Sequence, residues 1–221
     1  MEEPRPVARS NARYSAPSGR EKLPFDSTGY VSQQLRLSQK ADDKNVEEIF
    51  GVGPEDFISV FADLLEAIVE NGDLTQRQDM TVFHNAVPPA ISIHNYLQRI
   101  LKFTLCSSVC YLISMVYLDR IVKLNPSFTI SSKSIHRLIL TSVMTAAKFF
   151  DEKFINNAYF AKVGGVTIAE MNNLEKEFLN MIGFSLHVSP SVFAQYRKEL
   201  FFDAQMDQQL MHMSMEEIEH H

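Results

Sequence analysis

The chain has no tryptophan, only two cysteines and few of the residues that make tight turns. Two cysteines among 221 residues exclude a disulfide-rich secreted scaffold and fit a reducing compartment. Eight glycines and nine prolines disfavour an all-β fold, which needs many turns. Cys106 and Cys110 are four residues apart, but no second pair of ligands follows at the spacing of a zinc site. We therefore expect buried thiols and no metal.

Signals for secretion or membrane insertion are also lacking. The chain begins Met-Glu-Glu-Pro-Arg, without the basic stretch and apolar run of a signal peptide. Its longest apolar run, from Leu105 to Leu118, is interrupted by three serines and closed by Asp119, whereas a membrane-spanning helix needs about 20 apolar residues. We interpret this run as a buried helix, and we expect the protein in the cytoplasm, the nucleus or both, with no membrane partner.

The usual motifs of catalysis and ligand binding are missing as well. The sequence has no P-loop, GxGxxG, HExxH, GxSxG or CxxC motif, and its seven histidines accompany no positioned nucleophile. Aromatic residues do not alternate with basic ones, as they do in proteins that bind single-stranded nucleic acids. These absences favour a helical domain that is not an enzyme and needs no cofactor.

Charge is distributed unevenly along the chain, whose formal net charge is −6. Residues 1–22 carry five basic groups and three acids, residues 41–73 carry ten acids and one lysine, and residues 203–221 carry five acids and no lysine or arginine. Residues 91–184 hold ten basic groups and six acids, a balance of +4. We interpret these runs as solvated surfaces and residues 1–45 as a disordered tail. Pairing between the acidic flanks and the basic middle is the alternative.

Helical periodicity predicts an all-α fold, because apolar residues recur three and four positions apart and no segment alternates with period two. The expected helices run from Pro54 to Gly72, Ser92 to Phe103, Ser107 to Lys123, Ser131 to Phe149, Ala158 to Lys162, Thr167 to Gly183, and onward from Pro190. The helix that ends at Phe149 is apolar nearly all round and must lie inside the others. Thr167 and Glu170 form a capping-box pattern at the start of their helix.

Three stretches between residues 88 and 184 carry a recognisable pattern. They are Tyr117-Leu-Asp-Arg120, Ala146-Ala-Lys-Phe-Phe-Asp-Glu152, and Asn157-Ala-Tyr-Phe-Ala-Lys-Val-Gly-Gly165 with Glu170 and Leu174-Glu175 after it. Together they resemble a cyclin box of the P/U type, the group that includes the yeast phosphate-response cyclin and the plant U-type cyclins. The resemblance implies a single five-helix cyclin box at residues 88–184. An acidic N-terminal helix and linker at residues 46–87 would precede it, and a C-terminal helix and acidic tail at residues 185–221 would follow.

The resemblance implies a regulatory subunit without catalytic activity, which binds and activates a cyclin-dependent protein kinase with a PSTAIRE-like αC helix. Such a subunit acts by stabilising the active position of that helix. Lys148 matches the family lysine that reaches the kinase backbone, and Glu175 matches its acidic partner. Phe149 and Phe184 match apolar contact positions. The two helices that carry Lys148 and Glu175 would then have to lie side by side.

The resemblance gives roles to four other residues. Asp151 and Glu152 are acids near the kinase edge, where they would either pair with basic kinase groups or face solvent. Asp119 matches a family aspartate that pairs with an arginine and thereby supports the first box helix. In this sequence His94 stands at the position of that arginine. The charge of a His94–Asp119 pair would depend on pH. The Met-Arg-Ala-Ile-Leu docking motif of the family and the tryptophan after it are missing from this sequence. We therefore do not expect this protein to recruit substrates through Arg-x-Leu peptides.

Two other functions stay open at the level of sequence. A cyclin-fold protein of the transcription-factor kind would contact nucleic acid through the +4 box. Its binding would weaken steeply with salt, but the spread-out cations and acidic flanks argue against nucleic acid as a partner. A helical enzyme of unknown class is disfavoured by the missing motifs.

Overall fold

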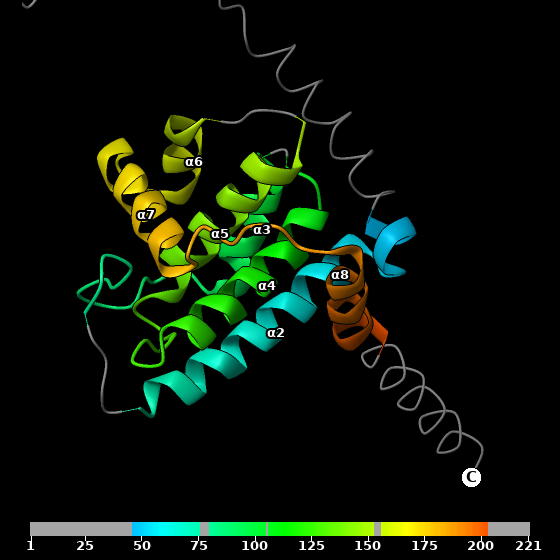
Figure 1. Ribbon diagram of the computed structural model, residues 1–221, viewed down its shortest axis with the longest axis horizontal. Coiled ribbons are helices and arrows are strands. Elements are labelled where there is room, and N and C mark those ends of the chain that lie inside the picture. Colours follow the sequence, from blue (N-terminus) through cyan, green and yellow to red (C-terminus); the bar gives the residue numbers. More distant parts are fainter. Residues whose placement is uncertain (1–45, 76–79, 105, 153–155, 203–221) are drawn as a thin grey trace, which may run out of the picture.

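The fold is all-α, as the sequence predicts. The computed structural model describes residues 46–75, 80–104, 106–152 and 156–202, and every regular element in these ranges is helical (Figure 1). The elements are α2 (Pro54–Asp73), α3 (Ile93–Thr104), α4 (Val109–Leu124), α5 (Ile135–Phe150), α6 (Asn157–Gly164), α7 (Ile168–Met181), α8 (Pro190–Arg197) and the π-helical turn η1 (Lys198–Phe202). Residues 46–50 are also helical. The tails expected at residues 1–45 and beyond residue 202 lie outside the described residues.

Two apolar helices form the centre of the molecule. The helices α4 and α5 pack against each other, and the other helices surround them in Figure 1. Residues 138–147 of α5 are buried without a break, so this helix touches neighbours around its whole circumference. It packs on α3, α4, α6 and α7. The expected central helix is confirmed, and the helices from α3 to α7 make up the five-helix arrangement.

Side-chain caps fix the starts of α6, α7 and α8. The hydroxyl of Thr167 accepts the N–H of Glu170, and the Glu170 carboxylate accepts the N–H of Thr167, which confirms the capping box. Gly165 ends α6 with φ 73°, in the left-handed region that glycine tolerates. The expected cap at Ser131-Ser132 is wrong, because α5 begins at Ile135 after Ser134, whose side chain caps nothing.

The flanking helices share the core of the box through a cluster of aromatic rings. Phe57 of α2 stacks on Phe201 of η1, with ring centroids 5.6 Å apart and planes only 4° from parallel. Phe50 contacts both rings at centroid distances of 4.8 and 5.0 Å. Tyr111 of α4 meets Phe57 edge-on at 6.1 Å. The two flanks of the chain are therefore joined to each other and to α4 by buried apolar surface.

The end of α2 approaches the backbone before α5 closely. A Cβ atom at Gly72 would lie 1.8 Å from the carbonyl oxygen of Ile130 and 2.9 Å from its carbonyl carbon. The sequence suggests Gly72 as a helix stop, but α2 continues to Asp73. The glycine is needed because two stretches of backbone touch at this point. No helix in the described part of the chain is long and apolar enough to cross a membrane.

Two buried histidines make stability depend on pH. Burial lowers the pKa of His136, whose Nε2 lies 2.8 Å from the carbonyl oxygen of Ile91 and whose ring meets Tyr96 edge-on. Burial, followed by the nearby charge of Lys133, lowers the pKa of His84. In both cases the folded state binds fewer protons than the unfolded state, in which the pKa is about 6.5.

We predict that the free energy of unfolding is highest above pH 6.5 and falls as the pH drops through 6.5 toward the lowered pKa values. Each unit of lowering is worth about 1.4 kcal/mol. Urea unfolding between pH 7.5 and 5.0 would measure this slope. The substitution His136→Gln removes one titrating group and should make the slope shallower. Equal slopes for the wild type and the variant would show that His136 does not contribute to the pH dependence of stability.

Candidate functional site

Lys148 and Glu175 meet where three helices come together. Lys148 is in the last turn of α5, and its Nζ lies 2.6 Å from Oε1 of Glu175 on α7. Asn157, the first residue of α6, joins both: its Oδ1 accepts a hydrogen bond from Lys148 Nζ, and its Nδ2 donates to Glu175 Oε2 at 2.7 Å. The same Nδ2 lies 2.7 Å from Oδ1 of Asn172. The structure thus brings the two expected partners together and adds Asn157, which the sequence reasoning did not single out.

Each member of this group is placed by its own helix. A cation at Lys148 complements the partial negative charge at the C-terminal end of α5. The side chain of Asn156 caps α6 by accepting the N–H of Tyr159, which fixes Asn157 in the first turn. An ion pair 3.1 Å long between Arg137 of α5 and Glu170 of α7 joins these two helices, which pack against each other.

The ion pair keeps hydrogen-bonding capacity for another molecule. The side chains of Lys148 and Glu175 are 22% and 21% exposed, so both can be reached from solvent. Lys148 uses two of its three N–H donors within the described residues, and each carboxylate oxygen of Glu175 accepts one bond and can accept another. The group can therefore donate to a carbonyl and accept from an N–H of an incoming chain without rearranging.

Exposed aromatic side chains lie beside this group. Phe149 follows Lys148 and is 50% exposed, and its ring meets that of Phe150 edge-on at 4.9 Å. On the other side, the hydroxyl of the exposed Tyr159 donates to the backbone carbonyl of Phe103, another exposed ring. These rings come from α3, α5 and α6.

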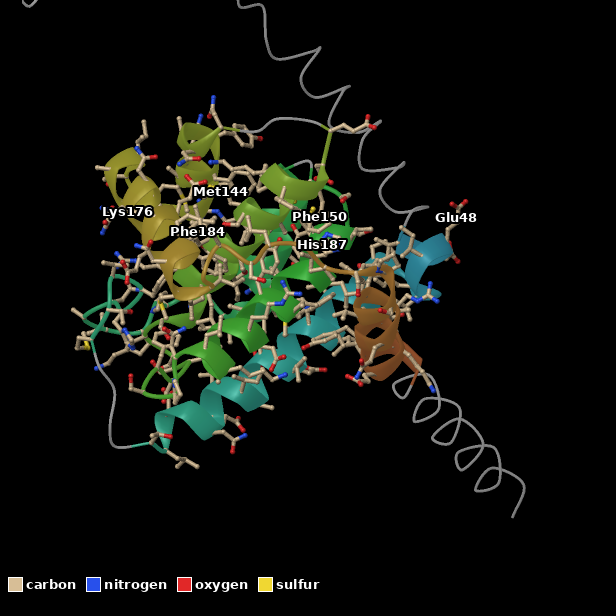
Figure 2. The ribbon with its side chains drawn as sticks, in the orientation of Figure 1. Glu48, Met144, Phe150, Lys176, Phe184 and His187 are labelled. Carbon is tan, nitrogen blue, oxygen red and sulfur yellow. The ribbon has the colours of Figure 1, made fainter. Side chains whose placement is uncertain are left out.

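Phe184 combines exposure with a strained backbone. Its side chain is 67% exposed, and its φ of 56° lies in the left-handed region that residues other than glycine rarely adopt. The conformation is held by hydrogen bonds from its N–H to Leu179 O at 2.9 Å and from the N–H of Leu186 to its own carbonyl at 3.1 Å. Figure 2 shows Phe184 where the chain leaves α7. Strain of this kind costs of order 1–3 kcal/mol.

The two acids after α5 have different surroundings. Asp151 accepts from the Ser107 hydroxyl at 2.6 Å through Oδ1 and from the Ser107 N–H at 2.9 Å through Oδ2. It therefore ties the end of α5 to the start of α4, a structural contact that the sequence reasoning did not foresee. Glu152 is exposed and makes no hydrogen bond or ion pair within the described part of the chain.

The structure corrects the expected pair of His94 and Asp119. Oδ2 of Asp119 accepts from the Tyr196 hydroxyl at 2.5 Å and from Lys123 Nζ at 2.6 Å, and no ion pair joins it to His94. The reason is the arrangement of the helices: Asp119 lies on the side of α4 that faces α8, whereas the α3 helix of His94 packs on α2, α5 and α6. Burial and the bond to Asp119 raise the pKa of Tyr196.

The cysteines are buried thiols, as the sequence predicts. Cys106 and Cys110 are both free and buried, and burial raises the pKa of Cys106 to about 12 and that of Cys110 further. Both are therefore protonated at neutral pH. Among the residues that the structure describes, no group of three or more histidine, cysteine, aspartate or glutamate side chains could hold a metal ion.

Comparison with known proteins agrees with this geometry. A family model described as Cyclin matches residues 25–186, which is more than half of the chain. The chain belongs to the cyclin family. The match includes α2 and every residue of the Lys148 group, and it begins well before the 88–184 span suggested by the three matching stretches.

Plant cyclins of the U and P types are similar to this chain, which confirms the resemblance seen in the sequence. Cyclin-U4-1 of Arabidopsis thaliana is 47% identical over 144 residues, which cover 63% of this chain and 71% of the relative. Cyclin-P4-1 of Oryza sativa subsp. japonica is 41% identical over 147 residues, covering 63% and 69%. Membership of the family implies a regulatory role with a cyclin-dependent kinase as partner.

We predict that Asp151→Ala destabilises this cyclin, because the Ser107 N–H and hydroxyl lose a charged acceptor. Hydrogen bonds to charged groups contribute about 1.5–3 kcal/mol, so the free energy of unfolding in urea should fall by about that amount. The matched control is Glu152→Ala, which should change it by no more than about 0.5 kcal/mol. Equal losses in the two variants would show that Asp151 has no special structural role.

Proposed function

We propose that this cyclin binds a cyclin-dependent protein kinase with a PSTAIRE-like αC helix and activates it by holding that helix in its active position. The observation that supports this most directly is the Lys148–Asn157–Glu175 group. It is a partly exposed ion pair, held by an amide at the junction of α5, α6 and α7, and it has hydrogen-bonding groups to spare. We also propose that the complex forms in the cytoplasm, the nucleus or both.

The difference in binding free energy that such a surface must supply follows from the shift it has to produce in the kinase. An active protein kinase pairs the lysine of its third strand with a glutamate of αC. A cyclin can favour that state only by binding it more tightly than the inactive one. Shifting the kinase from 1:99 to 99:1 in favour of the active state takes roughly 5.5 kcal/mol of differential affinity. A surface ion pair such as Lys148–Glu175 contributes about 0–1 kcal/mol, so it cannot supply this alone.

The exposed phenylalanines can supply the larger part. A phenylalanine side chain buries about 150–250 Å², at about 25 cal/mol per Å². Covering the exposed half of Phe149 is then worth about 2–3 kcal/mol, and covering the exposed two-thirds of Phe184 about 2.5–4 kcal/mol, before the cost of association. In this proposal the aromatic rings provide affinity, and the Lys148 group fixes the position of the kinase backbone.

Substitutions in the ion pair should weaken kinase binding without unfolding the box. Leaving one charge unpaired in an interface costs about 2–5 kcal/mol, so we predict at least a ten-fold loss of affinity for Lys148→Ala and for Glu175→Ala. The measurement is co-purification with a PSTAIRE-containing kinase, followed by a phosphorylation assay. A control variant is Lys162→Ala, which removes an exposed lysine from the last turn of α6. Wild-type kinase recovery with both ion-pair variants would refute the proposal.

Phe184 allows a second test, because one substitution there should leave the stability of the cyclin intact and still weaken its binding to the kinase. In Phe184→Gly the left-handed backbone becomes easy to adopt, so the isolated cyclin should unfold at the same or higher urea concentration than the wild type. The same variant loses the exposed ring and should bind the kinase at least ten-fold more weakly. If kinase affinity is unchanged, Phe184 is not a contact residue.

A further inference from the structure

Two helices of the box, α3 and α6, carry basic side chains and no aspartate or glutamate. Their exposed cations are Arg99 and Lys102 on α3 and Lys162 on α6. None of the three makes an ion pair or a hydrogen bond with another described residue. Lys102 lies over the ring of Phe103, with its Nζ 5.5 Å from the ring centroid.

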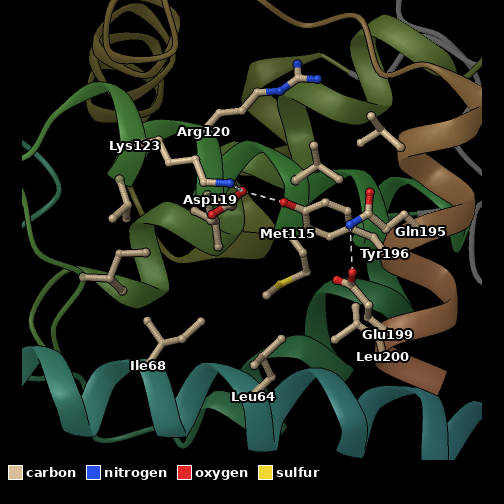
Figure 3. Close-up of a pocket in the computed structure, with 15 residues that line it drawn as sticks. Leu64, Ile68, Met115, Asp119, Arg120, Lys123, Gln195, Tyr196, Glu199 and Leu200 are labelled. Atoms are coloured by element: carbon tan, nitrogen blue, oxygen red, sulfur yellow. Dashed lines mark hydrogen bonds and ion pairs between the residues drawn. The ribbon is translucent and has the colours of Figure 1, made fainter. Parts of the chain in front are cut away.

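The cations of the two central helices, in contrast, all have polar partners. On α4, Lys123 pairs with Asp119 beside the pocket shown in Figure 3, and Arg120 donates to the carbonyl of Ser185. On α5, both cations pair with acids of α7. The cations of α3 and α6 therefore differ from those of the central helices in having no acid among the described residues to neutralise them.

Two hydrogen bonds fix how α3 and α6 lie against each other. The hydroxyl of Tyr159, near the start of α6, donates to the carbonyl of Phe103 at the end of α3. The hydroxyl of Tyr96, near the start of α3, donates to the carbonyl of Gly164 at the end of α6, at 3.2 Å. The two helices pack on each other and therefore run antiparallel.

The two helices repeat one pattern along this contact. In each of them the tyrosine that reaches across is followed three residues later by an exposed cation and four residues later by a buried apolar residue. The residues are Tyr96, Arg99 and Ile100 on α3, and Tyr159, Lys162 and Val163 on α6. In two antiparallel right-handed helices these matching positions fall on the same side of the contact. Arg99 and Lys162 therefore lie opposite each other on its solvent side.

Two like charges that are held side by side favour a ligand with two negative charges. A phosphoryl group on serine or threonine carries about −1.5 to −2 at neutral pH, whereas a carboxylate carries a single charge. The planar guanidinium of Arg99 can donate two parallel hydrogen bonds to phosphate oxygens, and the Lys162 ammonium adds a point charge. The axes of packed helices are about 8–10 Å apart, so these two long side chains can reach one phosphate.

Exposed rings lie next to this pair of cations. The side chains of Phe103 and Tyr159 are 41% and 38% exposed. Phe103 is four residues from Arg99 on the same helix, which is about 6 Å along the axis. In an extended peptide, residues two apart point the same way and are about 6.6 Å apart. A large apolar side chain two positions from a phosphorylated residue would therefore cover the rings.

We propose that Arg99, Lys162 and the rings of Phe103 and Tyr159 bind a phosphorylated segment of a partner protein. In that segment a phosphoserine or phosphothreonine lies two residues from a large apolar side chain, and Lys102 provides a further cation for acids that flank it. The surface is separate from the Lys148 group, so it gives the cyclin a second means of recognising a protein that has already been phosphorylated.

Larger polyanions fit this surface less well. The helix α2, which packs on α3, carries six acids and no lysine or arginine, and the formal net charge of the chain is −6. A nucleic acid or an anionic membrane that extended beyond α3 and α6 would meet this negative charge. A short segment would not, because charges more than about 8 Å away are largely screened at physiological salt.

Fluorescence anisotropy with the full chain can test this proposal. The probe is the fluorescein-labelled peptide Gly-Gly-Phe-Ala-phosphoserine-Ala-Phe-Gly-Gly, which offers an apolar side chain on both sides of the phosphate. We expect saturable binding that weakens as the salt concentration rises. The same peptide with glutamate or unmodified serine in place of phosphoserine should bind about ten-fold more weakly or less, because it forms fewer charged hydrogen bonds.

Substitutions supply the matched comparison. The double variant Arg99→Gln with Lys162→Gln should bind the probe at least about ten-fold more weakly than the wild type. The control is Lys176→Gln with Lys198→Gln, which removes the same charge from exposed positions on α7 (Figure 2) and at the end of α8 and should leave binding unchanged. Phe103→Ala should weaken binding of the probe but not of a version with glycine in place of both phenylalanines.

The proposal is overturned if the probe does not bind below about 1 mM, if the glutamate peptide binds as tightly, if the two double variants behave alike, or if Phe103→Ala affects both peptides equally. Tighter binding of vesicles of phosphatidylserine and phosphatidylcholine, or of a single-stranded oligothymidine, would also overturn it, because the occupant would then be a membrane or a nucleic acid. None of these measurements requires the kinase, so the result is independent of the proposed function.

Discussion

The structure depends on the burial of α5. Ten consecutive residues, 138–147, are buried, so the helix must be enclosed by α3, α4, α6 and α7 at once. The chain emerges only at the last turn, where Lys148 is partly exposed and Phe149 and Phe150 reach the surface. The charged and aromatic groups are therefore presented on a helix that cannot rotate or slide without disrupting the core. This rigidity is what a surface needs if it is to select one conformation of a partner.

The sequence predicts this core well, because burial leaves a periodic pattern. The apolar circumference of α5, the capping box at Thr167 and the breaks at proline and glycine all act locally, and they place five helices of the box to within a few residues. The Lys148–Glu175 pair follows from the resemblance to cyclins. Even the error at Ser131 concerns only where α5 begins.

The partners of polar side chains are harder to predict, since they depend on how the helices pack. Asp119 and Tyr196 are 77 residues apart, and Ser107 and Asp151 are 44 apart. No local pattern connects either pair. His94 was expected to pair with Asp119 because it stands at the position of the family arginine. The helix that carries it, α3, packs on α2, α5 and α6, whereas Asp119 lies on the side of α4 that faces α8. Asn157 stands in a matching stretch, yet its bridging role appears only when α6 is placed between the ends of α5 and α7.

The close approach of Gly72 to Ile130 couples the position of α2 to that of the segment before α5. Because the backbones touch with no side chain between them, α2 cannot shift toward the start of α5 without pushing it. The sixteen residues of α5 form a stiff rod about 24 Å long, with Ile130 shortly before one end and Lys148 near the other. The end of α2 thus touches the backbone segment that leads into the helix whose far end carries the ammonium group of Lys148.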